Sequence, residues 1–92
     1  MQRRIEMHPD YDTDYEQITK SNPRLRKKIE KQLRFLGGGE PWHPSLNFEF
    51  RKDRPGAWEF KIWVDKSWRI FGVLKDDVIE LYGLEPRENA YR

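Results

Sequence analysis

The strongest constraint on the fold of this chain is a pair of strand-forming runs separated by only three residues. Residues 58–64 (WEFKIWV) and 68–74 (WRIFGVL) are rich in β-branched and aromatic side chains, and Asp-Lys-Ser lies between them at 65–67. Because successive side chains of a strand point to opposite faces, the length of this loop decides which residues share a face. We therefore predict an antiparallel hairpin whose register follows from a three-residue loop.

A three-residue loop sorts the side chains of this hairpin into two chemically distinct sets. One face then carries only apolar residues, namely Trp58, Phe60, Ile62, Val64, Trp68 and Ile70. The other face carries charged and aromatic residues, namely Glu59, Lys61, Trp63, Arg69 and Phe71. A two-residue loop would mix the two sets and bury charge, which is costly. The predicted outer face therefore alternates cations with rings, and Lys61 and Arg69 lie near its middle.

Further strands are predicted on both sides of the hairpin. The run VIELYGL at 78–84 follows an Asp-Asp turn, which places Tyr82 opposite Phe71 on the outer face. Before the hairpin, LNFEF at 46–50 alternates apolar and polar residues and is predicted as a strand, whereas the turn-rich RKDRPG at 51–56 is predicted as a break. The C-terminal half is therefore expected to be a meander of antiparallel strands.

A short strand and a short helix are predicted at the N-terminus. RRIEMH at 3–8 alternates well enough for a strand with Ile5 and Met7 pointing inward, and Pro9 ends it. The sequence TDYE that follows has the spacing of a helix capping box, and tyrosines recur at helical intervals. A first helix is therefore predicted over 13–20.

The second helix has clearer signals at both ends. Asn22 is a good N-cap, Pro23 suits the first helical position, and the glycines at 37–39 end the helix. Its apolar stripe consists of Leu25, Ile29, Leu33 and Leu36. The two helices form a hairpin, and the predicted class is α+β: an N-terminal strand, a helical hairpin and an antiparallel meander, with the helices packed on one face of the sheet.

Composition narrows the class of protein further. The chain has 92 residues without a change in composition, so residues 1–92 are expected to form a single domain. It has no cysteine, which excludes disulfides and fits a reducing compartment. No apolar run approaches the roughly 20 residues that a membrane span needs. We therefore expect a cytoplasmic protein that does not interact with membranes.

The distribution of charge is more informative than the total. Eighteen Lys and Arg against 16 Asp and Glu give a net charge of +2, which by itself indicates no polyanionic partner. The second predicted helix, however, is strongly basic and carries the candidate nucleic-acid-binding residues Arg24, Lys27, Lys28 and Lys31. A solvated helix face would show the same pattern, so both interpretations stay open.

The outer face of the sheet is the second candidate for nucleic-acid binding. Cations such as Lys61 and Arg69 hold phosphates, and the rings of Trp63, Phe71 and Tyr82 can stack on bases. Half-exposed sheets also carry such residues without a function, and Arg69 could instead pair with Glu59 or Glu80. The sequence contains no metal-ligand or phosphate-loop motif, so no metal or small-molecule cofactor is expected.

At this point four short motifs, in order and over nearly the whole chain, resemble the RelE/ParE superfamily of bacterial toxins from type II toxin–antitoxin systems. They are HPSL at 43–46, WEFKI at 58–62, WRI at 68–70 and RENAY at 87–91. The resemblance implies the order β-α-α-β-β-β-β. It also implies a cognate antitoxin as protein partner.

The resemblance implies a mechanism as well. In ribonuclease members of the superfamily, messenger RNA on the ribosome is cleaved without a metal when the ribose 2′-hydroxyl attacks the adjacent phosphate. By motif, Arg69 would stabilise the phosphate, Lys61 would add a second electrostatic contact, and Arg87 and Tyr91 would be further catalytic positions. Glu49 and Glu80 are candidates for the base, although neither lies in a specific motif.

Two alternatives to the ribonuclease mechanism follow where this sequence departs from the motifs of the superfamily. Arg87 scarcely releases a proton, so it is a poor general acid if relatives use a histidine there. A non-catalytic toxin that acts on a protein target such as gyrase, as ParE-type relatives do, needs no acid or base. A member that has lost toxicity and only binds nucleic acid or a partner is the third reading.

Overall fold

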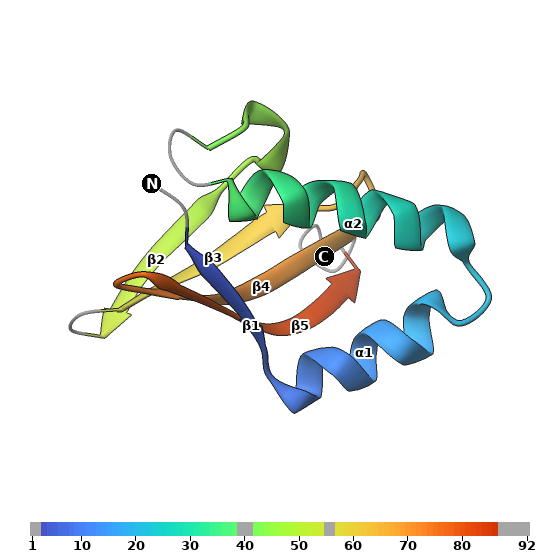
Figure 1. The fold of residues 1–92 in the computed structure, drawn as a ribbon, viewed down its shortest axis with the longest axis horizontal. Coiled ribbons are helices and arrows are strands. Elements are labelled where there is room, and N and C mark those ends of the chain that lie inside the picture. The colour runs from blue at the N-terminus through green and yellow to red at the C-terminus, as the bar shows by residue number, and fades with distance from the viewer. Residues whose placement is uncertain (1–2, 39–41, 55–56, 87–92) are drawn as a thin grey trace.

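The computed structural model describes residues 3–38, 42–54 and 57–86, and within them five strands form one sheet in the order β1-β5-β4-β3-β2 (Figure 1). The elements are β1 Arg4–Met7, α1 Pro9–Thr19, α2 Pro23–Gly37, a 3-10 turn η1 Pro44–Leu46, β2 Glu49–Arg54, β3 Ala57–Trp63, β4 Trp68–Lys75 and β5 Val78–Pro86. β1 runs parallel to β5, and all other neighbours are antiparallel. The predicted α+β class and element order are confirmed.

α2 covers one face of the sheet, which we call the inner face (Figure 1). The helix starts as predicted, because the side chain of Asn22 accepts a hydrogen bond from the backbone N–H of Leu25 at 3.1 Å and Pro23 occupies the first position. The core it helps to enclose includes Leu25, Ile29, Leu36, Phe60, Ile62, Ile70, Ile79 and Leu81. Burial of each such side chain contributes about 1.5–3 kcal/mol.

α1 begins four residues earlier than predicted and lies along the free edge of β5. The helix starts at Pro9 because the ring of His8 accepts a hydrogen bond from the backbone N–H of Asp10 at 3.1 Å. β1 pairs with β5 only as far as Leu81. Beyond that point the carboxylate of Asp14 accepts a hydrogen bond from the backbone N–H of Leu84 at 3.2 Å. The side chain of Asp14 therefore provides a hydrogen-bond acceptor for β5 where β1 no longer pairs with it.

The predicted register of the central hairpin is confirmed. Trp63 lies opposite Arg69 and Lys61 lies opposite Phe71, as a three-residue loop requires. On the inner face, Phe60, Ile62, Val64 and Ile70 are all buried. Trp58 is the exception, since it is 43% exposed and packs edge-on against the equally exposed Phe50, 6.0 Å away, near the β2 edge.

The pairing of β4 with β5 departs from the prediction at a β-bulge. Phe71 lies opposite Gly83 instead of Tyr82, because Tyr82 is an extra residue between two paired positions. A Cβ atom on residue 83 would lie 2.4 Å from the ring of Phe71. Glycine at this position therefore allows the Phe71 ring to lie over the backbone of β5, and the register shifts there.

Two further boundaries and one side-chain direction were predicted wrongly. η1 and Asn47, whose φ is +47°, occupy part of the predicted strand 46–50, so β2 begins only at Glu49. The predicted break at 51–56 is instead strand as far as Arg54, because the backbone continues to pair with β3. Met7, predicted to point inward, is 47% exposed because β1 is an edge strand.

A buried glutamine ties α2 to two other elements. Gln32 is 4% exposed, and its amide nitrogen donates to the carbonyl oxygens of Trp63 at 2.6 Å and Ser45 at 3.1 Å. Substituting Gln32→Leu leaves both carbonyls without this donor, so we expect a loss of about 2–3 kcal/mol in the free energy of unfolding. Urea unfolding measures it. Arg26→Leu on the exposed side of the same helix should change stability by less than about 0.5 kcal/mol, and equal losses would contradict this role of Gln32.

The hydroxyl of Tyr11 is buried and has no hydrogen-bond partner among the residues that the structure describes. Burial, together with the nearby Tyr15 and Asp12, raises the pKa of Tyr11 above its ordinary value of 10.0. Because the folded pKa is the higher one, this group's contribution to stability is complete below pH 10 and is lost as the pH rises above it.

Substituting Tyr11→Phe should therefore leave stability at pH 7 unchanged or raise it by about 1 kcal/mol, since an unpaired buried hydroxyl is costly. Above pH 10 the wild type should lose stability more steeply than the variant. Urea unfolding at pH 7 and at high pH tests both statements. A large loss of stability at pH 7 would show that the hydroxyl is hydrogen-bonded.

Candidate functional site

The outer face of the sheet, opposite α2, carries a row of residues across four strands. Lys61 on β3 lies between Glu49 on β2 and Phe71 on β4, and Gly83 on β5 continues the row. The next row, across β3, β4 and β5, places Arg69 between Trp63 and Glu85. The register therefore brings the two predicted cations, Lys61 and Arg69, to adjacent rows at the centre of this face.

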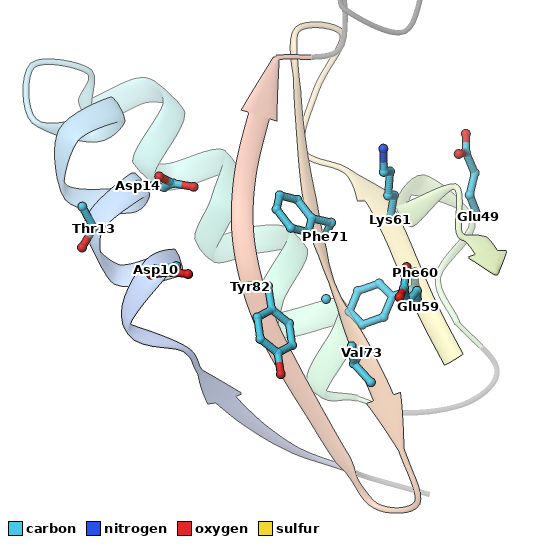
Figure 2. Close-up of a pocket in the computed structure, with 11 residues that line it drawn as sticks. Asp10, Thr13, Asp14, Glu49, Glu59, Phe60, Lys61, Phe71, Val73 and Tyr82 are labelled. Atoms are coloured by element: carbon cyan, nitrogen blue, oxygen red, sulfur yellow. The ribbon is translucent and has the colours of Figure 1, made fainter. Parts of the chain in front are cut away.

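A groove of about 700 Å³ lies over this face, between α1 and β2 (Figure 2). It is lined by Asp10, Thr13, Asp14, Glu49, Glu59, Phe60, Lys61, Phe71, Gly72, Val73 and Tyr82. In Figure 2 the α1 residues stand on one side of the groove, whereas Lys61 and Glu49 stand on the other. α1 and β2 therefore form the two sides of the groove, and residues of β3, β4 and β5 form its floor.

Arg69 reaches one wall of this groove through an ion pair. Its side chain is only 8% exposed, and its Nη1 lies 3.2 Å from Oε1 of Glu49, which is 60% exposed and lines the groove. Neither Glu59 nor Glu80, the partners considered from the sequence, forms this contact. The guanidinium is thus held in place by a carboxylate that can turn into the groove.

Lys61 is also paired with a carboxylate. Its Nζ lies 2.9 Å from Oε1 of Glu85, and the two side chains are 42% and 33% exposed. Glu85 lies directly opposite Arg69 in the sheet, and from β5 its side chain reaches across β4 to Lys61 on β3. Exposed pairs of this kind contribute little to stability, so an incoming phosphate can displace Glu85 at small cost.

The groove is less basic than the sequence suggested. Among the lining residues described, four are carboxylates, namely Asp10, Asp14, Glu49 and Glu59, and one is a cation, Lys61. Glu59 was already predicted on this face and Glu49 was a candidate base, whereas Asp10 and Asp14 come from α1, which a reading of the strands does not include. Free RNA should bind weakly to such a surface.

The three predicted stacking rings occupy different positions. Phe71 and Tyr82 line the groove, whereas Trp63 is half-buried on the same face but outside the lining residues. The hydroxyl of Tyr82 donates to Glu80 at 2.8 Å, and its ring lies 4.8 Å from that of His8. Phe71 and Tyr82 are thus placed to contact a base, and Glu80 holds one of them.

The remaining predicted residues lie elsewhere. Arg87 and Tyr91 fall outside the described residues. The helix residues Arg24, Lys27, Lys28 and Lys31 are exposed on α2, away from the groove, and Lys28 forms an ion pair with Asp65 at 3.3 Å. Within the described residues no group of metal-ligating side chains is found, and no helix is long and apolar enough to cross a membrane.

Sequence reasoning missed the wall of the groove that α1 provides. Asp10, Thr13 and Asp14 line it, but the first helix was predicted to start only at residue 13. The signal that could have shown the earlier start is the pair of His8 as cap and Pro9 at the first helical position. Even so, nothing local indicates that α1 lies beside β5.

Comparisons with known proteins show the fold. The sequence matches no protein-family model, and no curated protein matches it. Among solved structures, the DinJ–YafQ toxin–antitoxin complex of E. coli aligns over 100% of both chains with a TM-score of 0.75 and 15% identity. The YoeB dimer of Staphylococcus aureus aligns over 92% of this chain and 97% of its own, with a TM-score of 0.70 and 15% identity.

An archaeal structure shows the same similarity. The RelE–RelB complex of Pyrococcus horikoshii OT3 aligns over 95% of this chain and 97% of its own, with a TM-score of 0.64 and 15% identity. At such identities the likeness concerns the fold. The RelE-like fold expected from the four sequence motifs is therefore confirmed.

Proposed function

We propose that this chain, which has the RelE-like fold, is the toxin of a type II toxin–antitoxin system and cleaves messenger RNA on the ribosome without a metal. The observation that carries the proposal is the contact of Glu49 with Arg69 beside the outer groove. A carboxylate can act as a base and a guanidinium can bind phosphate, which are the first two needs of RNA cleavage. The toxin role is supported by the fold, since one similar structure is named as a toxin–antitoxin complex.

The proposed reaction is a transesterification within the RNA. The carboxylate of Glu49 takes the proton of the 2′-hydroxyl while the 2′-oxygen attacks the adjacent phosphorus. The bond from phosphorus to the 5′-oxygen breaks, leaving a 2′,3′-cyclic phosphate on one fragment and a 5′-hydroxyl, once protonated, on the other. Arg69 stabilises the charge that develops on the phosphate, because its planar guanidinium can hold two oxygens.

The ion pair between Glu49 and Arg69 is the proposed state of the site before RNA binds. Before substrate binds, Glu49 holds Arg69 at 3.2 Å. When phosphate oxygens take the place of the carboxylate on Arg69, Glu49 is released beside the phosphate it exchanged with. The base is then free only when the substrate phosphate is in place.

Other residues complete the proposed site. Lys61 adds positive charge once its pair with Glu85 opens, and Phe71 and Tyr82 stack on bases. Arg87 and Tyr91, which lie outside the described residues, keep their proposed roles: charge stabilisation for Arg87, and orientation or proton relay to the leaving oxygen for Tyr91.

The acidic groove supports dependence on the ribosome. Four carboxylates against one cation give little attraction for free RNA, so the message must be presented by something else. On the ribosome the messenger is already held, so contacts with the ribosome offset the entropy that the RNA loses when it is positioned. The antitoxin is proposed to cover the same groove with an extended or helical segment.

The same acidity favours one alternative, a non-catalytic toxin that binds a protein target such as gyrase. Inducible expression of the wild type and Arg69→Ala, with growth curves and primer extension on cellular messages, separates the two. The proposal expects growth arrest with new cleavage sites, both lost in the variant. Growth arrest with intact messages would favour the protein target, and normal growth with folded protein would contradict a toxin role.

A further inference from the structure

A β-bulge decides which side chain of β5 lies beside the two cations of the outer face. On one side of the bulge the strands pair Gly72 with Leu81. An unbroken ladder would continue from there to Arg69 opposite Leu84. The extra residue in the bulge shifts the register by one, so Arg69 lies opposite Glu85 and Leu84 is buried in the core. Bulges beside functional sites commonly re-aim a side chain in this way, and here a carboxylate lies on the outer face in place of a leucine.

This carboxylate is bound to the cation of the groove. Oε1 of Glu85 on β5 lies 2.9 Å from Nζ of Lys61 on β3. Lys61 is the one cation among the described residues that line the groove. Arg69, which reaches the wall of the groove, is held in the same way by Glu49. Both cations proposed to bind phosphate are therefore occupied by carboxylates of the chain itself.

The contact of Glu85 with Lys61 contributes little to folding. The two side chains are 33% and 42% exposed, and solvent screens ion pairs at such positions. The contact acts more strongly on a ligand, because a phosphate that approaches Lys61 must replace a carboxylate of the same sign of charge. Glu85 also repels that phosphate as long as it stays nearby. The effect of this carboxylate is therefore expected in RNA binding and not in stability.

We propose that Glu85 is a specificity-determining residue, whose carboxylate competes with phosphate for Lys61 and so disfavours the binding of free single-stranded RNA in the groove. The inference rests on the proposed function, and it names one residue that contributes to the dependence on the ribosome. A message held on the ribosome presents its phosphate to Lys61 at a fixed position, so it replaces the carboxylate at a high effective concentration. Free RNA must do so from dilute solution and without that orientation.

The test measures binding of a short labelled single strand of deoxynucleotides to the purified full chain at several salt concentrations. This probe has phosphates and bases but no 2′-hydroxyl, so the proposed cleavage cannot consume it. In Glu85→Gln, Lys61 is free to neutralise one more phosphate, and the slope of log K against log salt should steepen by about 0.7. Over the tenfold change from 1 M to 0.1 M salt, that slope corresponds to about fivefold tighter binding than in the wild type.

A double-mutant cycle shows whether Glu85 acts through Lys61. In a chain that already carries Lys61→Gln, adding Glu85→Gln should change the affinity by less than about twofold, because no cation is left to release. A gain as large as that seen with Lys61 present would show that the carboxylate acts only through net charge, and would overturn the proposal. The absence of a gain in either chain would overturn it as well.

The matched control is Glu30→Gln, which changes the net charge equally. Glu30 is exposed on α2, the helix that covers the other face of the sheet (Figure 1). Its removal should leave the slope unchanged and the affinity within about twofold, because distant charges are screened, and a gain equal to that of Glu85→Gln would overturn the proposal.

The proposed function and this inference fail separately. If the wild type leaves ribosome-bound message intact, the cleavage proposal is wrong, whereas the difference in binding between Glu85→Gln and the wild type would still show the competition for Lys61. If ribosome-bound message is cleaved but Glu85→Gln binds the single strand no more tightly than the wild type, only the role of Glu85 is wrong.

Discussion

Replacing Arg69 with alanine should reduce single-turnover cleavage of ribosome-bound message by at least about 100-fold, and Glu49→Gln should reduce it by about 100-fold to 1,000-fold. The first change removes the group proposed to stabilise the phosphate, and the second removes the proposed base. Arg69→Lys keeps the charge but loses the two-pronged hydrogen bonding, so its loss should be smaller than that of Arg69→Ala. The measurement is the rate of fragment formation with enzyme in excess over message.

The control for this pair of substitutions is Glu59→Gln. Glu59 lines the same groove but is not the carboxylate bound to Arg69. Its removal should change the cleavage rate by less than about threefold, in either direction, because it does not contact the cation proposed to bind the phosphate and would act on the reaction through the local field. If Glu59→Gln is as damaging as Glu49→Gln, the assignment of the base is wrong.

Gly72→Ala should destabilise the protein more than alanine at any other glycine of the sheet that the structure describes. A Cβ at this position would lie 2.2 Å from the carbonyl oxygen of Glu80 and 3.1 Å from Cζ of Phe60. The first contact is with backbone, which cannot move unless β5 shifts at its bulge. We expect a loss of about 3 kcal/mol or more, a large part of the 5–15 kcal/mol typical of a domain.

Gly37→Ala is the matched control for added volume. Its Cβ would lie 3.5 Å from Cδ1 of Ile5, an ordinary contact, and alanine favours a helix. Urea unfolding should show stability unchanged or raised by up to about 1 kcal/mol. If Gly72→Ala unfolds at the same urea concentration as the wild type, then β4 and β5 are not packed as described.

The sequence predicts the central hairpin well because two local signals agree there. Alternation along each strand and a three-residue loop both require Trp63 to face Arg69, and the structure has that pairing. The same logic fails one strand later. It places Phe71 opposite Tyr82, but the ring of Phe71 lies over Gly83 and the extra residue forms a bulge. A bulge depends on packing across strands, which turn length does not describe.

The site was only partly predictable for the same reason. Lys61, Phe71 and Tyr82 were placed on one face by alternation alone, and all three line the groove. The contact of Arg69 with Glu49 joins residues 20 positions apart on β4 and β2, so it requires the strand order as well as the register. The acidic wall from α1 depends on how a helix lies beside a sheet edge, which no local pattern in the sequence specifies.

The chemistry of the RNA ends tests the central claim most directly. Message programmed on ribosomes is incubated with the wild type or Arg69→Ala, and the ends of any fragments are identified. Attack by the 2′-hydroxyl predicts a 2′,3′-cyclic phosphate on the upstream fragment and a 5′-hydroxyl on the downstream fragment, both absent with the variant. Intact message with the wild type, or fragments that carry a 5′-phosphate, would contradict the account.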